Sequence, residues 1–96
     1  MLRSTVSVPT EHASRYLQQL SKHWSHKFAV EFDPHHSEID FGDGRKVDLK
    51  ATDAALYIVV TSTDESKLPQ LQEVVAVHIK RFAFREELDF KWTNSA

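Results

Sequence analysis

The sequence predicts a single α+β domain in which two helices cover one face of a mainly antiparallel sheet. Two segments have the 3.6-residue apolar spacing of amphipathic helices, while the others alternate apolar and polar residues as half-buried strands do. Gly42, Asp43 and Gly44 are typical of a tight hairpin turn. The order of elements is β-α-β-β-β-β-α-β. Because each helix has one apolar face, both are expected on the dry side of the sheet, in a two-layer sandwich.

The N-terminal part of the chain predicts a strand followed by a helix. Residues 5–8 alternate polar and apolar side chains, and Pro9 ends this strand. Thr10 is the expected N-cap of a helix that begins at Glu11 and ends near His26. The residues that share the apolar face of this helix are Ala13, Tyr16, Leu17, Leu20 and Trp24.

Strands fill the middle of the chain, where the apolar period changes from 3.6 to 2. The predicted strands cover residues 28–33, 38–41, 46–50 and 56–60. Pro34, His35 and His36 are expected to form a solvated turn between the first two of them.

The C-terminal part predicts a second helix and a last strand. Pro69 lies in the first turn of this helix, where a missing N–H costs little. The apolar face consists of Leu68, Leu71, Val74, Val75, Ile79 and Phe82, and it includes His78. The last strand is predicted from the alternation of Leu88, Phe90 and Trp92, and the polar residues 93–96 are expected to form a frayed tail.

Length and composition indicate one soluble domain over residues 1–96, with its core within about 5–92. A net charge of -2 disfavours nucleic acid and a polybasic membrane anchor as partners. With no cysteine, disulfides and thiolate metal sites are excluded. No apolar segment is long enough to span a bilayer, and the N-terminus lacks the apolar region of a signal peptide. We therefore expect a cytoplasmic protein.

His78 is the leading candidate for a functional residue, because it lies within an apolar helix face. A buried imidazole must satisfy its ring nitrogens or cost about 1–3 kcal/mol. Two interpretations remain open. His78 is either a core histidine bonded to a backbone carbonyl or a carboxylate, or a residue that binds a ligand or metal or transfers a proton.

Cationic side chains are concentrated at the ends of the two helices. If these ends meet, five of these side chains would converge into a site for an anion, namely His23, Lys27, His78, Arg81 and Arg85. With His26 and Glu86 added, the candidate ligand-binding residues are His23, His26, Lys27, His78, Arg81, Arg85 and Glu86. The alternative is that Lys27 complements the C-terminal end of the first helix, and that Arg81, Arg85 and Glu86 belong to a solvated helix end with weak ion pairs.

No metal and no cofactor are expected. His23 and His26 are three residues apart on a helix, but no cysteine or carboxylate at a recognised offset completes a metal-binding motif. Neither a glycine-rich phosphate loop nor a nucleophile elbow is present. The carboxylates predicted on the open face of the sheet are expected to keep that surface soluble, and they are Glu31, Glu38, Asp40, Asp48 and Asp89.

Three segments, YLQQLSKHWSHKFAVEF, IDFGDG and VVAVHIKRFAFREELDFKW, resemble the bacterial family catalogued as domain of unknown function 2218. The similarity extends from about Val6 to Trp92. Members often have a cysteine where this chain has Ser21, so an obligatory thiol is not expected there. The resemblance implies a small bacterial protein without established activity. Relatives joined to or found near siderophore-interacting flavin reductases further imply a link to iron metabolism.

The positions that the resemblance carries over to this chain are His23, His26, Lys27, His78, Arg81, Phe82, Arg85 and Glu86. The family assigns no role to any of them.

Three classes of function remain. The preferred one is a non-enzymatic module that binds a small anionic ligand, such as a ferric chelate, or a siderophore-related protein. The second is an interaction or assembly domain, including a homodimer, that uses an edge strand or Phe90 and Trp92. The third and least favoured is a small enzyme with His78 as general base and Arg81 or Arg85 as anion clamp.

Overall fold

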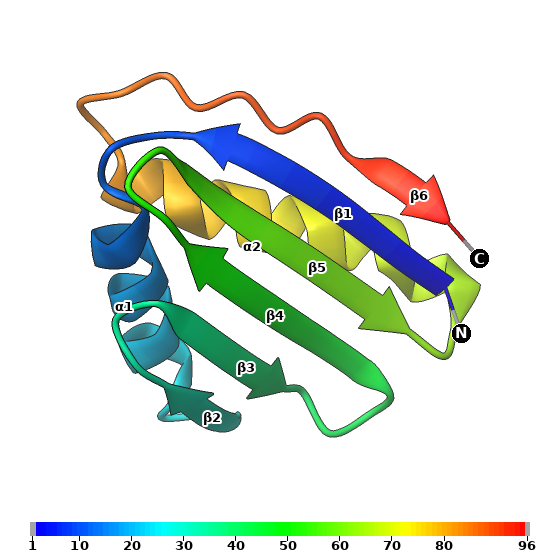
Figure 1. Ribbon diagram of the computed structural model, residues 1–96. Helices are drawn as coiled ribbons and strands as arrows, with labels where there is room; N and C mark the ends of the chain where they lie inside the picture. The colour runs from blue at the N-terminus through cyan, green and yellow to red at the C-terminus, as the bar shows by residue number, and fades with distance from the viewer. Residues whose placement is uncertain (1, 96) are drawn as a thin grey trace.

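Two helices lie on one face of a six-stranded sheet in the computed structural model, which describes residues 2–95 (Figure 1). The strands are β1 (Leu2–Pro9), β2 (Ala29–Phe32), β3 (His36–Asp40), β4 (Arg45–Ala51), β5 (Ala55–Ser62) and β6 (Thr93–Ser95). The helices are α1 (Ala13–Trp24) and α2 (Leu68–Phe82), with a short 3-10 turn, η1 (Glu65–Lys67), before α2. The predicted α+β class, the order β-α-β-β-β-β-α-β and the placement of both helices on one face are confirmed.

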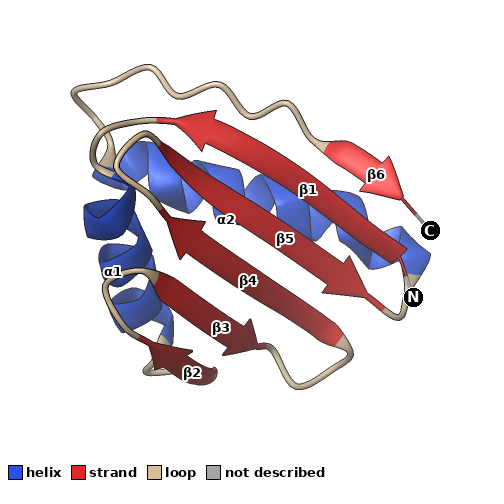
Figure 2. Ribbon diagram, in the orientation of Figure 1, coloured by secondary structure: helices blue, strands red, loops and turns tan. Residues whose placement is uncertain are grey.

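The strands are arranged in the order β2-β3-β4-β5-β1-β6, and every neighbouring pair is antiparallel (Figure 2). Because successive side chains of a strand point to opposite faces, each strand gives one row to the helices and one to solvent. Val6 is paired with Ile58, and Val47 with Val60, all on the buried side. This register places the charged residues of the same strands together on the open face.

The core lies between the sheet and the helices. Helix α1 covers β2 to β5, and α2 covers β1 and β5. Each large aliphatic side chain buried there contributes about 1.5–3 kcal/mol relative to full exposure. The largest fully buried side chains include Leu17, Leu20, Ile39, Leu49, Leu56, Ile58, Leu71 and Ile79. Within residues 2–95, neither helix is long and apolar enough to cross a membrane.

Helix α1 is shorter than predicted, because it begins at Ala13 and ends at Trp24. Thr10 is not its N-cap. Its hydroxyl oxygen instead accepts a hydrogen bond from the backbone N–H of His12 (3.1 Å) and donates to Glu86 (3.0 Å). A polar side chain before the helix therefore connects the start of α1 to a distant segment instead of closing the first turn.

The predicted last strand over residues 88–92 is wrong, because β6 lies at Thr93–Ser95 and residues 88–92 form no regular element. The alternation in that segment has another cause. Leu88 is buried, and Phe90 and Trp92 pack half-buried against the core, while the backbone begins to pair with β1 only at Thr93. Residues 93–95, expected in the frayed tail, thus form an edge strand.

The side chain of Gln72 helps to hold this edge. Its amide nitrogen donates to the hydroxyl of Ser4 on β1 (2.5 Å) and to the side-chain oxygen of Asn94 on β6 (2.8 Å). Gln72 is half-buried beside the sheet.

The predicted glycine turn between β3 and β4 is confirmed, with φ of 85° at Gly42 and 89° at Gly44. Their surroundings differ. A Cβ atom on Gly42 would meet no heavy atom within 4 Å, whereas one on Gly44 would overlap the hydroxyl of Thr63. The backbone N–H of Thr63 also donates to the carbonyl oxygen of Gly44 (3.1 Å), so the two segments cannot separate freely.

We expect Gly44→Ala to lower the free energy of unfolding by roughly 2–4 kcal/mol, because it adds a steric overlap to the strain of positive φ. Gly42→Ala is the matched control and should cost only about 1–2 kcal/mol, from φ alone. Urea unfolding measures both. Thr63→Ala should restore part of the loss in Gly44→Ala, and equal losses for the two alanine variants would contradict this account.

Candidate functional site

His78 lies on the apolar side of α2, as the helical spacing predicted, and its ring contacts α1. Its Nδ1 is 2.7 Å from the carbonyl oxygen of Val74, and because a carbonyl oxygen only accepts, Nδ1 carries the proton. The half-buried ring has its centroid 5.2 Å from that of His23 and 5.1 Å from that of Trp24. The hydrogen bond of Nδ1 is the one expected of a core histidine bonded to a backbone carbonyl. The other ring nitrogen, Nε2, has no hydrogen bond within residues 2–95.

Of the candidate ligand-binding residues predicted from the sequence, His23 and His78 lie together in the structure. The ring of Phe82 lies edge-on to His23, with centroids 6.3 Å apart, and completes an aromatic contact between α1 and α2. In the described part of the chain, no other hydrogen bond, ion pair or ring contact joins two members of the set. The members that lie exposed at or beyond the helix ends without such a contact are His26, Lys27, Arg81 and Arg85.

Arg85 and Glu86 line a different feature, a hollow of about 570 Å³ between the start of α1 and the segment that follows α2. We call it the helix-side hollow. Its lining residues are His12, Arg15, Tyr16, Phe82, Ala83, Phe84, Arg85 and Glu86. Phe84 is 77% exposed, and the guanidinium carbon of Arg85 lies 5.3 Å from the centroid of its ring.

The carboxylate of Glu86 accepts hydrogen bonds from two hydroxyl groups. Tyr16 and Thr10 both donate to it, the latter at 3.0 Å. These bonds join the segment after α2 to the start of α1. Burial, the hydrogen bond to Glu86 and the negative charge of that carboxylate together raise the pKa of Tyr16 to about 12, and burial contributes most. Glu86 therefore fixes the geometry of the hollow.

The helix-side hollow is cationic at its rim and aromatic on its walls. Arg15 and Arg85 are exposed, and neither forms an ion pair within residues 2–95. Guanidinium groups bind carboxylates in a planar, bidentate geometry. The arrangement can therefore hold an anion that carries an apolar ring. Helical spacing did not find His12 and Arg15, because the approach of residues 82–86 to the start of α1 is a tertiary contact.

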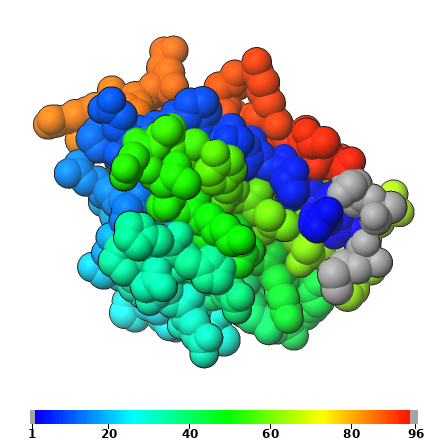
Figure 3. Space-filling model, viewed as in Figure 1, coloured from blue at the N-terminus to red at the C-terminus, as the bar shows by residue number. Residues whose placement is uncertain are grey.

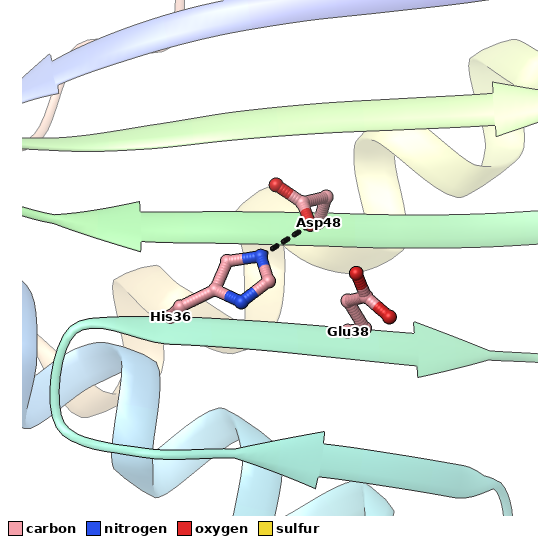
Figure 4. A group of neighbouring side chains, drawn as sticks. All are labelled: His36, Glu38 and Asp48. Carbon is pink, nitrogen blue, oxygen red and sulfur yellow. Dashed lines mark hydrogen bonds and ion pairs between the residues drawn. The ribbon is translucent and has the colours of Figure 1, made fainter.

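A second group of polar side chains lies on the open face of the sheet (Figure 4). His36 Nε2 is 2.7 Å from Asp48 Oδ1, and Glu38 on β3 is directly opposite Asp48 on β4. One ligand atom from each of the three residues lies within 4.8 Å of the other two. An imidazole and two carboxylates at this separation can bind a metal ion.

The prediction of a turn over Pro34, His35 and His36 needs correction, because His36 is the first residue of β3. Asp33 closes the turn. Its Oδ1 accepts from the backbone N–H groups of His35 (2.8 Å) and His36 (2.9 Å), and these bonds lower the pKa of Asp33. His36 is thereby held in the strand, where its side chain shares a face with Glu38.

Next to this group is a hollow of about 410 Å³ over β2 to β5, which we call the sheet-side hollow. Figure 3 views the molecule from this side, where the side chains of β2 to β5, coloured blue-green to green, form the surface. The charged residues that line the hollow are Glu31, Glu38, Asp40, Lys46 and Asp48. The sequence predicted these carboxylates on the open face but not the approach of His36 to Glu38 and Asp48, although the glycine turn fixes the register that pairs Glu38 with Asp48.

Comparison with known proteins identifies the family. Residues 5–93 match the family described as an uncharacterized protein conserved in bacteria (DUF2218), and the chain belongs to this family. The NMR structure of PA4090 from Pseudomonas aeruginosa is similar, with 44% sequence identity and a TM-score of 0.82 over 97% of this chain and 96% of that one. No match was found among curated proteins. The predicted family is confirmed.

The Tyr16–Glu86 contact predicts a stability change in alkali. Since the native-state pKa of Tyr16 is about 12 and the unfolded value about 10, its stabilising contribution is complete below pH of about 10 and is lost as the pH rises through about 12. Tyr57→Phe leaves Tyr16 as the only tyrosine, so absorbance at alkaline pH should report its ionisation near 12. Glu86→Gln should lower this midpoint. A midpoint near 10 in protein that circular dichroism shows to be folded would contradict the contact.

Proposed function

We propose that this bacterial protein is a non-enzymatic module that binds a small aromatic anion, such as an aryl carboxylate or a catecholate, in the helix-side hollow. The observation that carries the proposal is the exposed ring of Phe84 beside the guanidinium groups of Arg15 and Arg85, which have no ion-pair partner within residues 2–95. A catecholate ligand would agree with the iron link that the family resemblance implies, because catecholate oxygens bind ferric iron.

Charge supports an anionic ligand. Two arginines of the lining are free to pair with it, while Glu86, the single acidic residue of the lining, already accepts hydrogen bonds from Tyr16 and Thr10. Hydrogen bonds between charged groups contribute about 1.5–3 kcal/mol each when they replace contacts with water. An anion at the rim would therefore gain more than a neutral ligand of the same shape.

The aromatic walls support a ligand with a ring. Phe82 is half-buried and Phe84 projects into solvent, so a planar ligand could lie against both without rearranging the core. Offset and edge-to-face contacts between aromatic rings add about 0.5–1.5 kcal/mol beyond area burial. A volume of about 570 Å³ lies within the range of small-ligand sites.

The positions of the other candidates favour binding over the two alternatives. His78 does not line the helix-side hollow, so His78 as the base of an enzyme and Arg85 as its anion clamp would lie in different places. The rings of Phe90 and Trp92 stack 6.2 Å apart and are half-buried against the core. Docking through these rings would offer a partner little exposed apolar surface.

Titration with 2,3-dihydroxybenzoate, followed by heteronuclear NMR, tests the proposal. We expect the largest shifts at residues 12–16 and 82–86. Arg85→Gln and Arg15→Gln should each weaken binding by about tenfold, because each removes one charged contact. Arg81→Gln is the matched control, since Arg81 is an exposed arginine of α2 that does not line the hollow, and its affinity should equal that of the wild type.

Catechol, which lacks the carboxylate, separates the charge from the ring. We expect it to bind about tenfold more weakly than 2,3-dihydroxybenzoate, with shifts in the same residues. Equal affinity of the two compounds, equal loss in Arg81→Gln and Arg85→Gln, or shifts confined to His23 and His78 would each contradict a site in the helix-side hollow.

A further inference from the structure

We propose that His36, Glu38 and Asp48 form a binding site for one divalent transition-metal ion on the open face of the sheet (Figure 4). This site is separate from the helix-side hollow, because the helices cover the opposite face of the sheet. The three side chains come from two neighbouring strands, and one ligand atom of each lies within 4.8 Å of the others.

The strands hold these ligands in place before any ion binds. His36 and Glu38 are two residues apart on β3 and therefore point to the same face, and Glu38 pairs directly with Asp48 on β4. The backbone of His36 is fixed by the carboxylate of Asp33, and its ring by the 2.7 Å bond to Asp48. A site on paired strands loses little conformational freedom when it binds.

The distribution of charge points to a cation independently of the ligand geometry. Glu31, Glu38 and Asp48 lie side by side across β2, β3 and β4, since Glu31 pairs with Glu38 and Glu38 with Asp48. Like charges directly opposite one another destabilise a sheet.

The lysines of β4 do not lie directly opposite these carboxylates. In the strand register, Lys46 is opposite Asp40 and Lys50 is opposite His36. Glu38 forms no ion pair within residues 2–95, so a bound cation would offset repulsion that the side chains leave uncompensated.

The ligand set favours a transition metal over Mg²⁺ or Ca²⁺. Imidazole suits Zn²⁺ and related ions, whereas Mg²⁺ and Ca²⁺ prefer oxygen ligands alone. On binding through Nε2, the ion would take the place of the proton that His36 Nε2 donates to Asp48, and the neutral imidazole would carry its proton on Nδ1 instead. Three protein ligands leave coordination positions open, and the adjoining sheet-side hollow of about 410 Å³ has room for water on them.

Titration of the full chain with Zn²⁺ tests the site by calorimetry and NMR. We expect one ion per chain and shifts centred on residues 36, 38 and 48. Asp48→Asn and Glu38→Gln should each weaken Zn²⁺ binding at least about tenfold. Asp40→Asn is the matched control for both variants, because Asp40 lies on the same face of β3 outside the set.

Thermal unfolding provides a second readout that a purely structural role would not produce. Without Zn²⁺, Glu38→Gln should unfold at a higher temperature than the wild type, because it removes a repulsion. With Zn²⁺, the wild type should gain stability by mass action, while Glu38→Gln should gain little. Affinity unchanged in both Asp48→Asn and Glu38→Gln, shifts centred on His23 and His26, or preference for Ca²⁺ over Zn²⁺ would each overturn the proposal.

Discussion

Burial of two amphipathic helices against one face of an antiparallel sheet is the constraint on which the rest of the structure depends. Each helix has one apolar face, so α1 and α2 must share the dry side of the sheet. This placement has two consequences. The helices meet each other at the edge of the core, through His23, Trp24 and His78, and the opposite face of the sheet stays open.

Each proposed site follows from one of these consequences. The helix-side hollow exists because the chain leaves α2 at Phe82 and returns along the start of α1, where Glu86 is held by Tyr16 and Thr10. The group of His36, Glu38 and Asp48 exists because paired strands carry their polar rows on the uncovered face. The first offers cationic groups and the second anionic ones, so a net charge of -2 conceals two surfaces of opposite sign.

The sequence was sufficient to predict the architecture because period and polarity report which face of an element is buried. The two helices, the glycine turn and the strands of the central sheet all follow from this signal. The prediction of a strand failed at Leu88, Phe90 and Trp92. These side chains alternate because they are buried or half-buried against the core, although their backbone is not paired with another strand. The pairing of Thr93 with β1 could not be read locally, since a polar tail carries no period of its own.

The candidate sites were harder to predict because they depend on contacts between distant segments. Spacing alone brought His78 to the inner face of α2, where its ring meets His23. Spacing could not show that Arg85 and Glu86 lie beside His12 and Arg15 instead, because the approach occurs beyond the end of the helix. The proximity of Glu38 and Asp48 on the open face could have been predicted from the sequence. The glycine turn at Gly42 and Gly44 sets the β3–β4 register, and this register places Glu38 opposite Asp48.

The most direct test of the account is to locate a bound aromatic anion by intermolecular nuclear Overhauser effects. With 2,3-dihydroxybenzoate as the ligand, we predict cross-peaks from its ring protons to the side chains of Tyr16, Phe82 and Phe84, which line the helix-side hollow. Cross-peaks to Trp24 and His78 in place of these would contradict it, because they would place the ligand at the contact between the two helices.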